Sequence, residues 1–214
     1  MISKNFENIF IDFDGVILDS NKFKEEAIEN VIFDLFGKYD YNRKAIKYFN
    51  EFAGIGRKKK LLKFFNEDEV VNILNLYNSK CKNYLTHAKP TIGFKDFLIY
   101  FKNEFKNTNL YILSGSESNE IEYFLRKNFI LNYFRGILAS EKSKLNHLLS
   151  MTLKSDDIFI GDSKSDLKAA MFVNMQFILM EGFRSDNSYP AENNSYKNIY
   201  KTENFFTLLN YLKL

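Results

Sequence analysis

Short apolar runs that stop abruptly at an acid, a hydroxyl or a glycine recur along this chain of 214 residues. They are Phe10–Val16, Leu110–Ser116, Gly136–Ala139 and Ile158–Asp166, and Met175–Met180 adds a further apolar run. Segments with helical periodicity stand between them. Repeated strand and helix units predict an α/β fold, with a parallel sheet covered by helices on both faces. In such a sheet the ligand site lies beyond the carboxyl ends of the strands.

Helical patterns in the sheet-forming part cover Phe94–Phe105, Glu117–Lys127, Leu145–Leu153, Ser165–Phe172 and Asn204–Leu212. Between positions 20 and 88 the periodicity is helical throughout, over Lys22–Phe36, Asn42–Phe52, Lys58–Phe65 and Asp68–Leu85. We therefore expect an α/β core, 1–19 and 89–214, and an inserted helical segment, 20–88. Pro90–Gly93 is predicted as the return hinge, and the polar stretch Tyr189–Tyr200 as a surface loop.

Two carboxylates, Asp12 and Asp14, stand at the end of the first predicted strand, before Gly15. Side chains at positions i and i+2 of a strand point the same way, so we expect both acids in one pocket. Glycine permits the sharp turn that follows. Two like charges held together need a cation or a shared proton, and oxygen ligands suit Mg²⁺. An isolated Asp-x-Asp is also typical of a simple acidic turn, so the interpretation depends on the other segments.

The second run ends in Ser114 and Gly115. A hydroxyl beside backbone N–H groups at a strand-to-helix turn is suited to hold phosphate. Ser114 is equally suited to cap the helix expected near Glu117.

A lysine follows the third run, just before a predicted helix, and Lys142 and Lys144 compete for the position. A cation there neutralises a phosphoryl group in transfer and keeps a nearby carboxylate ionised. We favour Lys142, because Leu145, Leu148 and Leu149 then form the inward face of the helix.

The fourth run ends in a second pair of acids, Asp162 and Asp166. Asp162 directly follows Gly161 at the strand end, where a metal ligand is expected. We expect Asp166 on the first turn of the following helix, where it would face the same cavity. The helix dipole alone also favours an acid at that position.

Together the four segments resemble the haloacid dehalogenase superfamily, in its phosphatase branch near phosphoglycolate phosphatase and beta-phosphoglucomutase. The superfamily pattern is Asp-x-Asp-Gly-(Thr/Val), a Ser or Thr after a strand, a Lys, and Gly-Asp-(x)3-Asp. In many relatives the lysine precedes a proline, whereas neither candidate lysine does so here. The resemblance implies a Rossmann-like core with an inserted helical cap domain of the first type.

The resemblance also implies a mechanism. Asp12 is the expected nucleophile, which forms an aspartyl-phosphate, and Asp14 the acid and base, whose pKa has to be raised for that role. Mg²⁺ is expected on Asp12, on the backbone carbonyl of Asp14 and on Asp162, with Asp166 supporting them. The acid at position 14 favours phosphate esters over carbon–halogen bonds as substrates.

Substrate choice is expected to lie in the helical segment. The glycine-containing stretch Ala53–Arg57 is similar to a cap loop that reaches the active site in related sugar-phosphate enzymes, so Arg57 is a candidate contact for the leaving group. Asn21, shortly after the first motif, is a second candidate.

Composition excludes several classes of protein. A net charge of +3 without strong clustering, and with one basic run at 57–60, does not indicate nucleic-acid binding. No segment reaches the ~20 apolar residues of a membrane helix, and the N-terminus has no signal-peptide pattern. One cysteine agrees with a reducing cytoplasm.

We therefore expect a cytoplasmic Mg²⁺-dependent phosphatase acting on a small phosphorylated metabolite, a sugar, polyol or amino-alcohol phosphate. A phosphomutase of the same superfamily and a catalytically silent binding protein stay open as alternatives. The sequence does not predict an oligomeric state.

Overall fold

The computed structural model describes residues 6–52, 56–184 and 199–213. In this part of the chain six parallel strands form one sheet in the order β3-β2-β1-β4-β5-β6. The strands are β1 Asn8–Ile11, β2 Asn109–Leu113, β3 Gly136–Leu138, β4 Ile158–Gly161, β5 Gln176–Met180 and β6 Ile199–Thr202. The first strand lies in the middle, between β2 and β4, so its carboxyl end opens at the centre of one sheet edge.

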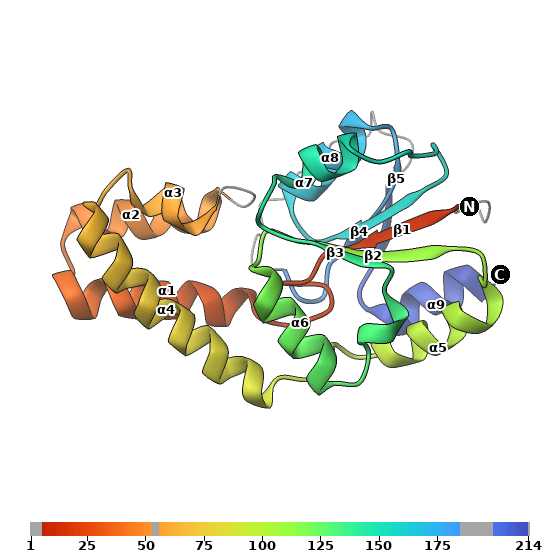
Figure 1. The fold of residues 1–214 in the computed structure, drawn as a ribbon, viewed down its shortest axis with the longest axis horizontal. Coiled ribbons are helices and arrows are strands. Elements are labelled where there is room, and N and C mark those ends of the chain that lie inside the picture. Colours follow the sequence, from red (N-terminus) through yellow and green to blue (C-terminus); the bar gives the residue numbers. More distant parts are fainter. Residues whose placement is uncertain (1–5, 53–55, 185–198, 214) are drawn as a thin grey trace.

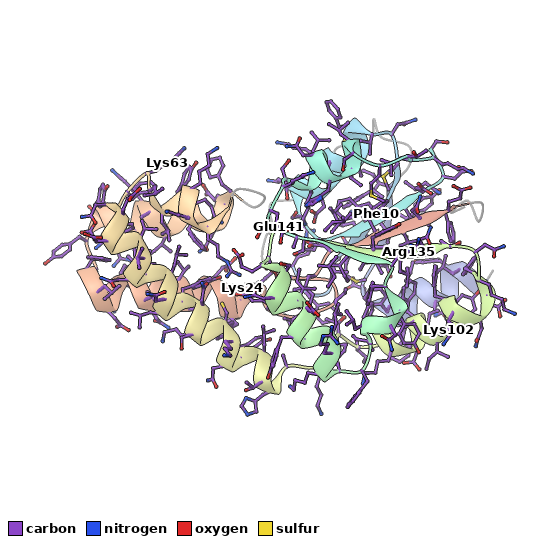
Figure 2. The ribbon with its side chains drawn as sticks, viewed as in Figure 1. Phe10, Lys24, Lys63, Lys102, Arg135 and Glu141 are labelled. Carbon is purple, nitrogen blue, oxygen red and sulfur yellow. The ribbon has the colours of Figure 1, made fainter. Side chains whose placement is uncertain are left out.

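Helices cover both faces of the sheet (Figure 1), as predicted. They are α5 Phe94–Glu104, α6 Ser118–Lys127, α7 Lys144–Leu149, α8 Lys164–Phe172 and α9 Phe205–Lys213, and a short 3₁₀ turn spans Leu131–Tyr133. Alternate residues of a strand enter opposite layers: Ile9 and Ile11 pack with α5, α6 and α9, whereas Phe10, labelled in Figure 2, packs with α7 and α8. The period of two along β1 therefore fixes which helices cover which face.

Four further helices lie beside the sheet instead of on it (Figure 1). They are α1 Asn21–Phe36, α2 Asp40–Glu51, α3 Arg57–Leu61 and α4 Glu67–His87. We call them the helical group. They enclose their own hydrophobic cluster, which includes Ile28, Phe49, Ile73 and Cys81. The group thus has a core separate from the two layers that flank the sheet.

The two chain segments that join the helical group to the sheet lie against each other. The Thr91 hydroxyl donates to the carbonyl of Val16 at 2.6 Å, and the Thr91 N–H donates to the carbonyl of Ile17 at 2.8 Å. These bonds hold the return segment directly beside the turn that carries the first acid pair.

The structure departs from the sequence predictions in three places, and the other helix ends shift by only one or two residues. Tyr200 lies in β6, which pairs with β5, so the predicted loop is wrong at its last residues; positions 189–198 lie outside the described residues. Helix α3 ends at Leu61 instead of Phe65, and the residues that follow form turns up to Asn66, whose side chain caps α4. Helix α7 ends at Leu149, four residues earlier than predicted.

Candidate active site

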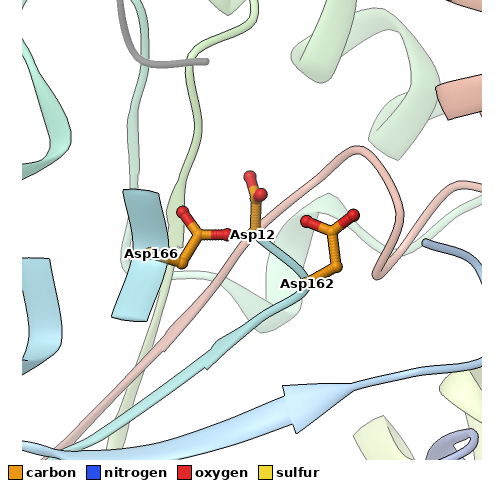
Figure 3. A group of neighbouring side chains, drawn as sticks. All are labelled: Asp12, Asp162 and Asp166. Carbon is orange, nitrogen blue, oxygen red and sulfur yellow. The ribbon is translucent and has the colours of Figure 1, made fainter. Parts of the chain in front are cut away.

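Three acids meet where β1 and β4 end. Asp12 follows β1, Asp162 follows β4, and Asp166 lies on the first turn of α8. Each has an oxygen within 4.8 Å of an oxygen on the other two (Figure 3), and all three residues are buried. The sheet order thus brings together acids that are 150 positions apart in the sequence, because β1 and β4 are neighbours.

Lys144 balances part of this charge. Its Nζ lies 2.8 Å from Asp12 Oδ2 and 2.5 Å from Asp166 Oδ1. The preference for Lys142 was therefore wrong: Lys142 is exposed, whereas Lys144 is buried as the first residue of α7, after the N-cap Ser143. The inward face of α7 consists of Lys144, His147 and Leu148, and the predicted inward residue Leu149 is 57% exposed.

Burial, together with the charges of the cluster, shifts the pKa values of its acids. Burial raises the pKa of Asp12 well above its usual value, although Lys144 acts in the opposite direction. Burial and the charge of Asp166 raise the pKa of Asp162 to about 7. With the three acids ionised and Lys144 protonated, the charge is −3 + 1 = −2. A divalent cation with a preference for oxygen ligands, such as Mg²⁺, fits both this charge and this donor set.

Two glycines make room for the acids. A Cβ at Gly15, where φ is +74°, would lie 2.0 Å from Asp162 Oδ2. A Cβ at Gly161 would lie 2.6 Å from the Cβ of Asp166. Both positions exclude a side chain for steric reasons, and at Gly15 the backbone conformation also favours glycine.

Asn21, predicted as a substrate contact, binds Asp162. Its Nδ2 donates to Asp162 Oδ2 at 2.7 Å and to the carbonyl of Phe183 at 3.1 Å. In this structure Asn21 therefore orients a carboxylate of the acidic cluster.

Asp14 lies in a different environment from Asp12, because β1 ends at Ile11 and the chain turns between the two acids. Asp14 Oδ1 accepts hydrogen bonds from Ser20 Oγ at 2.5 Å and lies 2.6 Å from Lys24 Nζ; Asp14 Oδ2 accepts from Ser116 Oγ at 2.5 Å. Burial alone would raise the pKa of Asp14, but the Lys24 charge and these hydrogen bonds outweigh it and lower the pKa. The expected raised pKa was therefore wrong for this conformation, since the sequence prediction omitted Lys24.

Sequence reasoning missed Ser20, Lys24 and Ser116 as neighbours of Asp14. Ser116 stands two residues after Ser114, in the same motif, and its place beyond a strand end was an available signal. No sequence signal indicated the contact of Lys24 with Asp14, because one lysine on a charged helix is normally solvated.

Ser114 and Gly115 lie at the end of β2, as predicted. Ser114 is buried, its N–H donates to the carbonyl of Leu138, and its Oγ accepts the N–H of Ser116 at 3.1 Å. Gly115 lies in the exposed bend that follows. Helix α6 has Glu117 as its N-cap, so the alternative of Ser114 as the cap was wrong.

Arg57 binds an acid of the α/β part. Its Nη1 and Nη2 each lie 2.7 Å from an oxygen of Glu120 on α6, and Nη1 also donates to Asn78 Oδ1 at 2.9 Å. The Arg57 and Glu120 side chains are 10% and 11% exposed. The predicted loop contains Ala53, Gly54 and Ile55, which lie outside the described residues.

Comparison with known proteins agrees with this geometry. A family model described as haloacid dehalogenase-like hydrolase matches residues 9–180, which include both acid pairs and the lysine. The chain belongs to this family. No curated protein matches it significantly.

Solved structures share the fold of this family member over nearly the whole chain. Beta-phosphoglucomutase from Clostridium difficile has 20% identity and a TM-score of 0.72, over 97% of this chain and 96% of that one. A predicted phosphatase from Clostridium acetobutylicum has 18% identity and a TM-score of 0.72, over 98% and 99%. CbbY from Rhodobacter sphaeroides, in complex with phosphate, has 17% identity and a TM-score of 0.72, over 98% and 100%. At these identities the likeness shows the fold.

None of the described helices is long and apolar enough to cross a membrane.

Proposed function

We propose that this hydrolase is a Mg²⁺-dependent phosphatase that releases phosphate from a small phosphorylated metabolite, with a sugar, polyol or amino-alcohol phosphate as substrate. The observation that carries the proposal is the contact of Lys144 with both Asp12 and Asp166, beside Asp162. A buried nucleophilic carboxylate, a cation and a set of oxygen ligands are the parts that phosphoryl transfer requires. The family match and the similar structures of beta-phosphoglucomutase and of a predicted phosphatase support the same class of reaction.

Asp12 is the nucleophile in this proposal. A carboxylate oxygen of Asp12 forms a bond to phosphorus, and the bond from phosphorus to the leaving-group oxygen breaks. Asp12 already accepts the N–H of Phe13 at 2.7 Å, which fixes the direction of its carboxylate. Lys144 neutralises charge on the transferring group, and its own pKa is raised by Asp12 and Asp166 despite burial, so it stays protonated.

Asp14 moves the protons. It gives a proton to the leaving-group oxygen and then takes one from the water that attacks the aspartyl-phosphate, as reversal of acid and base roles requires. The water oxygen bonds to phosphorus as the bond from phosphorus to Asp12 breaks, which releases phosphate and restores Asp12. The lowered pKa of Asp14 in this conformation favours the ionised form, which is the form needed for the second step.

Asp12, Asp162 and the backbone carbonyl of Asp14 are the proposed ligands of Mg²⁺, with Asp166 holding Lys144. When bound, the ion supplies positive charge to the phosphoryl oxygens. Asp162 is held by Asn21, and Asp166 by the Ser163 N–H and hydroxyl, so second contacts fix the direction of both carboxylates.

We further propose that residues 20–88 act as a cap domain on the core formed by 1–19 and 89–214. The separate hydrophobic cluster of the helical group supports this division. A cap that closes over the site excludes water and chooses the substrate. A reducing cytoplasm is the proposed location, because the one cysteine of the chain, Cys81, is free and buried.

Hydrolysis of p-nitrophenyl phosphate by the purified protein tests the proposal. We expect turnover with added Mg²⁺, loss of turnover with excess chelator, and at least a 100-fold loss in Asp12→Asn. Turnover that survives Asp12→Asn would contradict it.

A phosphomutase is the second candidate, since beta-phosphoglucomutase shares the fold. It would interconvert sugar-phosphate isomers without net release of phosphate. A panel of phosphorylated metabolites, followed by both liberated phosphate and isomer analysis, separates the two activities.

A further inference from the structure

Lys24 is the one cation that the helical group places on the carboxylate of Asp14, within the described part of the chain. It lies on the first turn of α1, and Figure 2 labels it where α1 approaches α6. Its Nζ is 2.6 Å from Asp14 Oδ1 and 2.8 Å from Ser116 Oγ. Lys24 thus joins the helical group to two residues of the α/β part at the position of the proposed acid.

The position of Lys24 is restricted. The side chains of Lys24 and Asp14 are both 18% exposed. The lysine also lines a cavity of about 10 Å³ together with Phe13, Cys81 and Glu120. A cavity of this size is at the lower limit for one water molecule. Packing therefore leaves the ammonium little freedom to move away from Asp14.

One N–H of Lys24 remains available for a ligand. A lysine ammonium has three N–H groups. Asp14 and Ser116 account for two of them, and the described residues provide no third acceptor. A leaving-group oxygen that takes a proton from Asp14 has to lie about 3 Å from that carboxylate. It then comes close to the ammonium, because Lys24 and Asp14 are themselves in contact.

We propose that Lys24 is a further catalytic residue, which contacts the leaving-group oxygen and stabilises the negative charge that forms there as the bond to phosphorus breaks. This inference rests on the proposed phosphatase function. Lys24 does not replace Asp14 as proton donor: the proton still comes from Asp14, and Lys24 supplies a fixed positive charge. The contribution is greatest for a basic leaving group such as the alkoxide of a sugar or polyol.

If Lys24 only connected the helical group to the α/β part, its loss would have a different effect on the kinetics. The loss of that connection would lower kcat on all substrates by the same factor. Stabilisation of the leaving group affects a substrate more strongly when its leaving group is more basic. Phenyl phosphate and p-nitrophenyl phosphate have nearly the same shape, but phenolate is a much stronger base than p-nitrophenolate, so the pair isolates this difference.

The experiment measures kcat and KM of the full chain with Mg²⁺ on both aryl phosphates. For Lys24→Met we expect kcat to fall about 100-fold on phenyl phosphate and no more than about threefold on p-nitrophenyl phosphate, where little charge needs stabilising. Lys24→Arg keeps the charge and should recover part of the loss on phenyl phosphate. Lys22→Met is the matched control, because Lys22 is on the same helix, its side chain is 87% exposed, and its ion-pair partner is Glu26.

Equal losses of kcat on both substrates, or no loss on either, would overturn the inference. The test compares kcat on the two aryl phosphates within one variant, so a reduced folded fraction of Lys24→Met cancels in the ratio. If Lys24→Met does not fold, the same ratio is measured for Lys24→Arg. Failure of the underlying function is distinct, since it would appear as turnover that survives Asp12→Asn in the same assay.

Discussion

Single residues decide the charge of the active site. Asp12, Asp162 and Asp166 share one buried lysine, so the site without a metal ion retains negative charge that burial makes unfavourable. The raised pKa of Asp162, about 7, is the measurable consequence. This charge and the steric space around it each have consequences that experiments can test.

Metal affinity should depend on pH near neutrality. A carboxylate must lose its proton to bind a metal ion. Since the pKa of Asp162 is raised to about 7, the affinity for Mg²⁺ should fall as the pH is lowered from 8 to 6. Isothermal titration calorimetry at the two pH values measures this. An affinity that stays constant over this range would contradict the assignment of Asp162 as a ligand.

The stability of the metal-free protein should change in the opposite direction. A carboxyl group whose pKa is higher in the folded state binds more protons when folded, so stability rises as the pH falls through that pKa toward the unfolded value of 3.8. In excess chelator, the melting temperature should therefore be higher at pH 5.5 than at pH 7.5. Asp162→Asn should reduce this difference; an unchanged difference would show that other groups cause it.

Steric space at the glycines gives the next prediction. Gly15→Ala would place a Cβ 2.0 Å from Asp162 Oδ2 at a positive φ, so activity should fall by at least 100-fold through displacement of that carboxylate. Gly56→Ala is the matched control, because a Cβ there meets nothing within 4 Å. Phosphatase assays and melting curves of both variants test the difference. Comparable activity in the two variants would refute the steric argument.

The lysine shows how far residues can be assigned from sequence. The motif predicted a lysine just before a helix, and the structure provides Lys144 as the first residue of α7. The choice of Lys142 depended on which residues of α7 face inward, and the structure buries Lys144, His147 and Leu148 there. Ser116 follows a strand end, so its place near Asp14 was predictable, but the contacts of Ser20 and Lys24 with Asp14 were not, because they form only in the folded chain.

The site forms at the ends of secondary-structure elements: Asp12 and Asp162 follow the ends of β1 and β4, and Asp166 lies at the start of α8. Local patterns predicted five of the six described strands and placed each described helix within a few residues of its position. Strand β6 was missed since Ile199–Thr202 is a short edge strand with an exposed lysine, which alone resembles a polar loop. Its pairing with β5 supplies the structure that its own sequence does not specify.

Substitutions at two helix caps should show that one cap affects stability alone and the other affects both stability and activity. Helices α4 and α8 both begin with a capping box, from Asn66 and Glu69 and from Ser163 and Asp166. Asn66→Ala and Ser163→Ala should each lower the free energy of unfolding by roughly 1 kcal/mol. Only Ser163→Ala should also lower activity, because the Ser163 hydroxyl donates at 2.8 Å to Asp166, which holds Lys144. Denaturant titrations and kcat measurements test this pair; equal activity in both variants would show that Asp166 needs no such support.

At the scale of the whole molecule, the question is what holds the helical group in place. Among the described residues, two ion pairs connect it to the α/β part near the acidic cluster, Lys24 with Asp14 and Arg57 with Glu120. The second is bidentate, and the Arg57 guanidinium also lies 5.0 Å from the centre of the Tyr77 ring. Burial reduces the screening of the Arg57–Glu120 pair by solvent. This pair is therefore the stronger candidate for the contact that holds the helical group in place.

Loss of the Arg57–Glu120 pair should let the helical group move away from the α/β part. In Glu120→Gln the buried Arg57 keeps its charge but loses its carboxylate partner, which disfavours the observed arrangement. We expect a larger radius of gyration by small-angle X-ray scattering, and a KM for a small phosphate ester that is raised more strongly than kcat is lowered, because closure has to be driven by substrate binding. Lys47→Met is the control, since the Lys47–Glu51 pair is exposed and lies within α2. An unchanged radius of gyration and an unchanged KM in Glu120→Gln would show that apolar packing, and not this ion pair, positions the helical group.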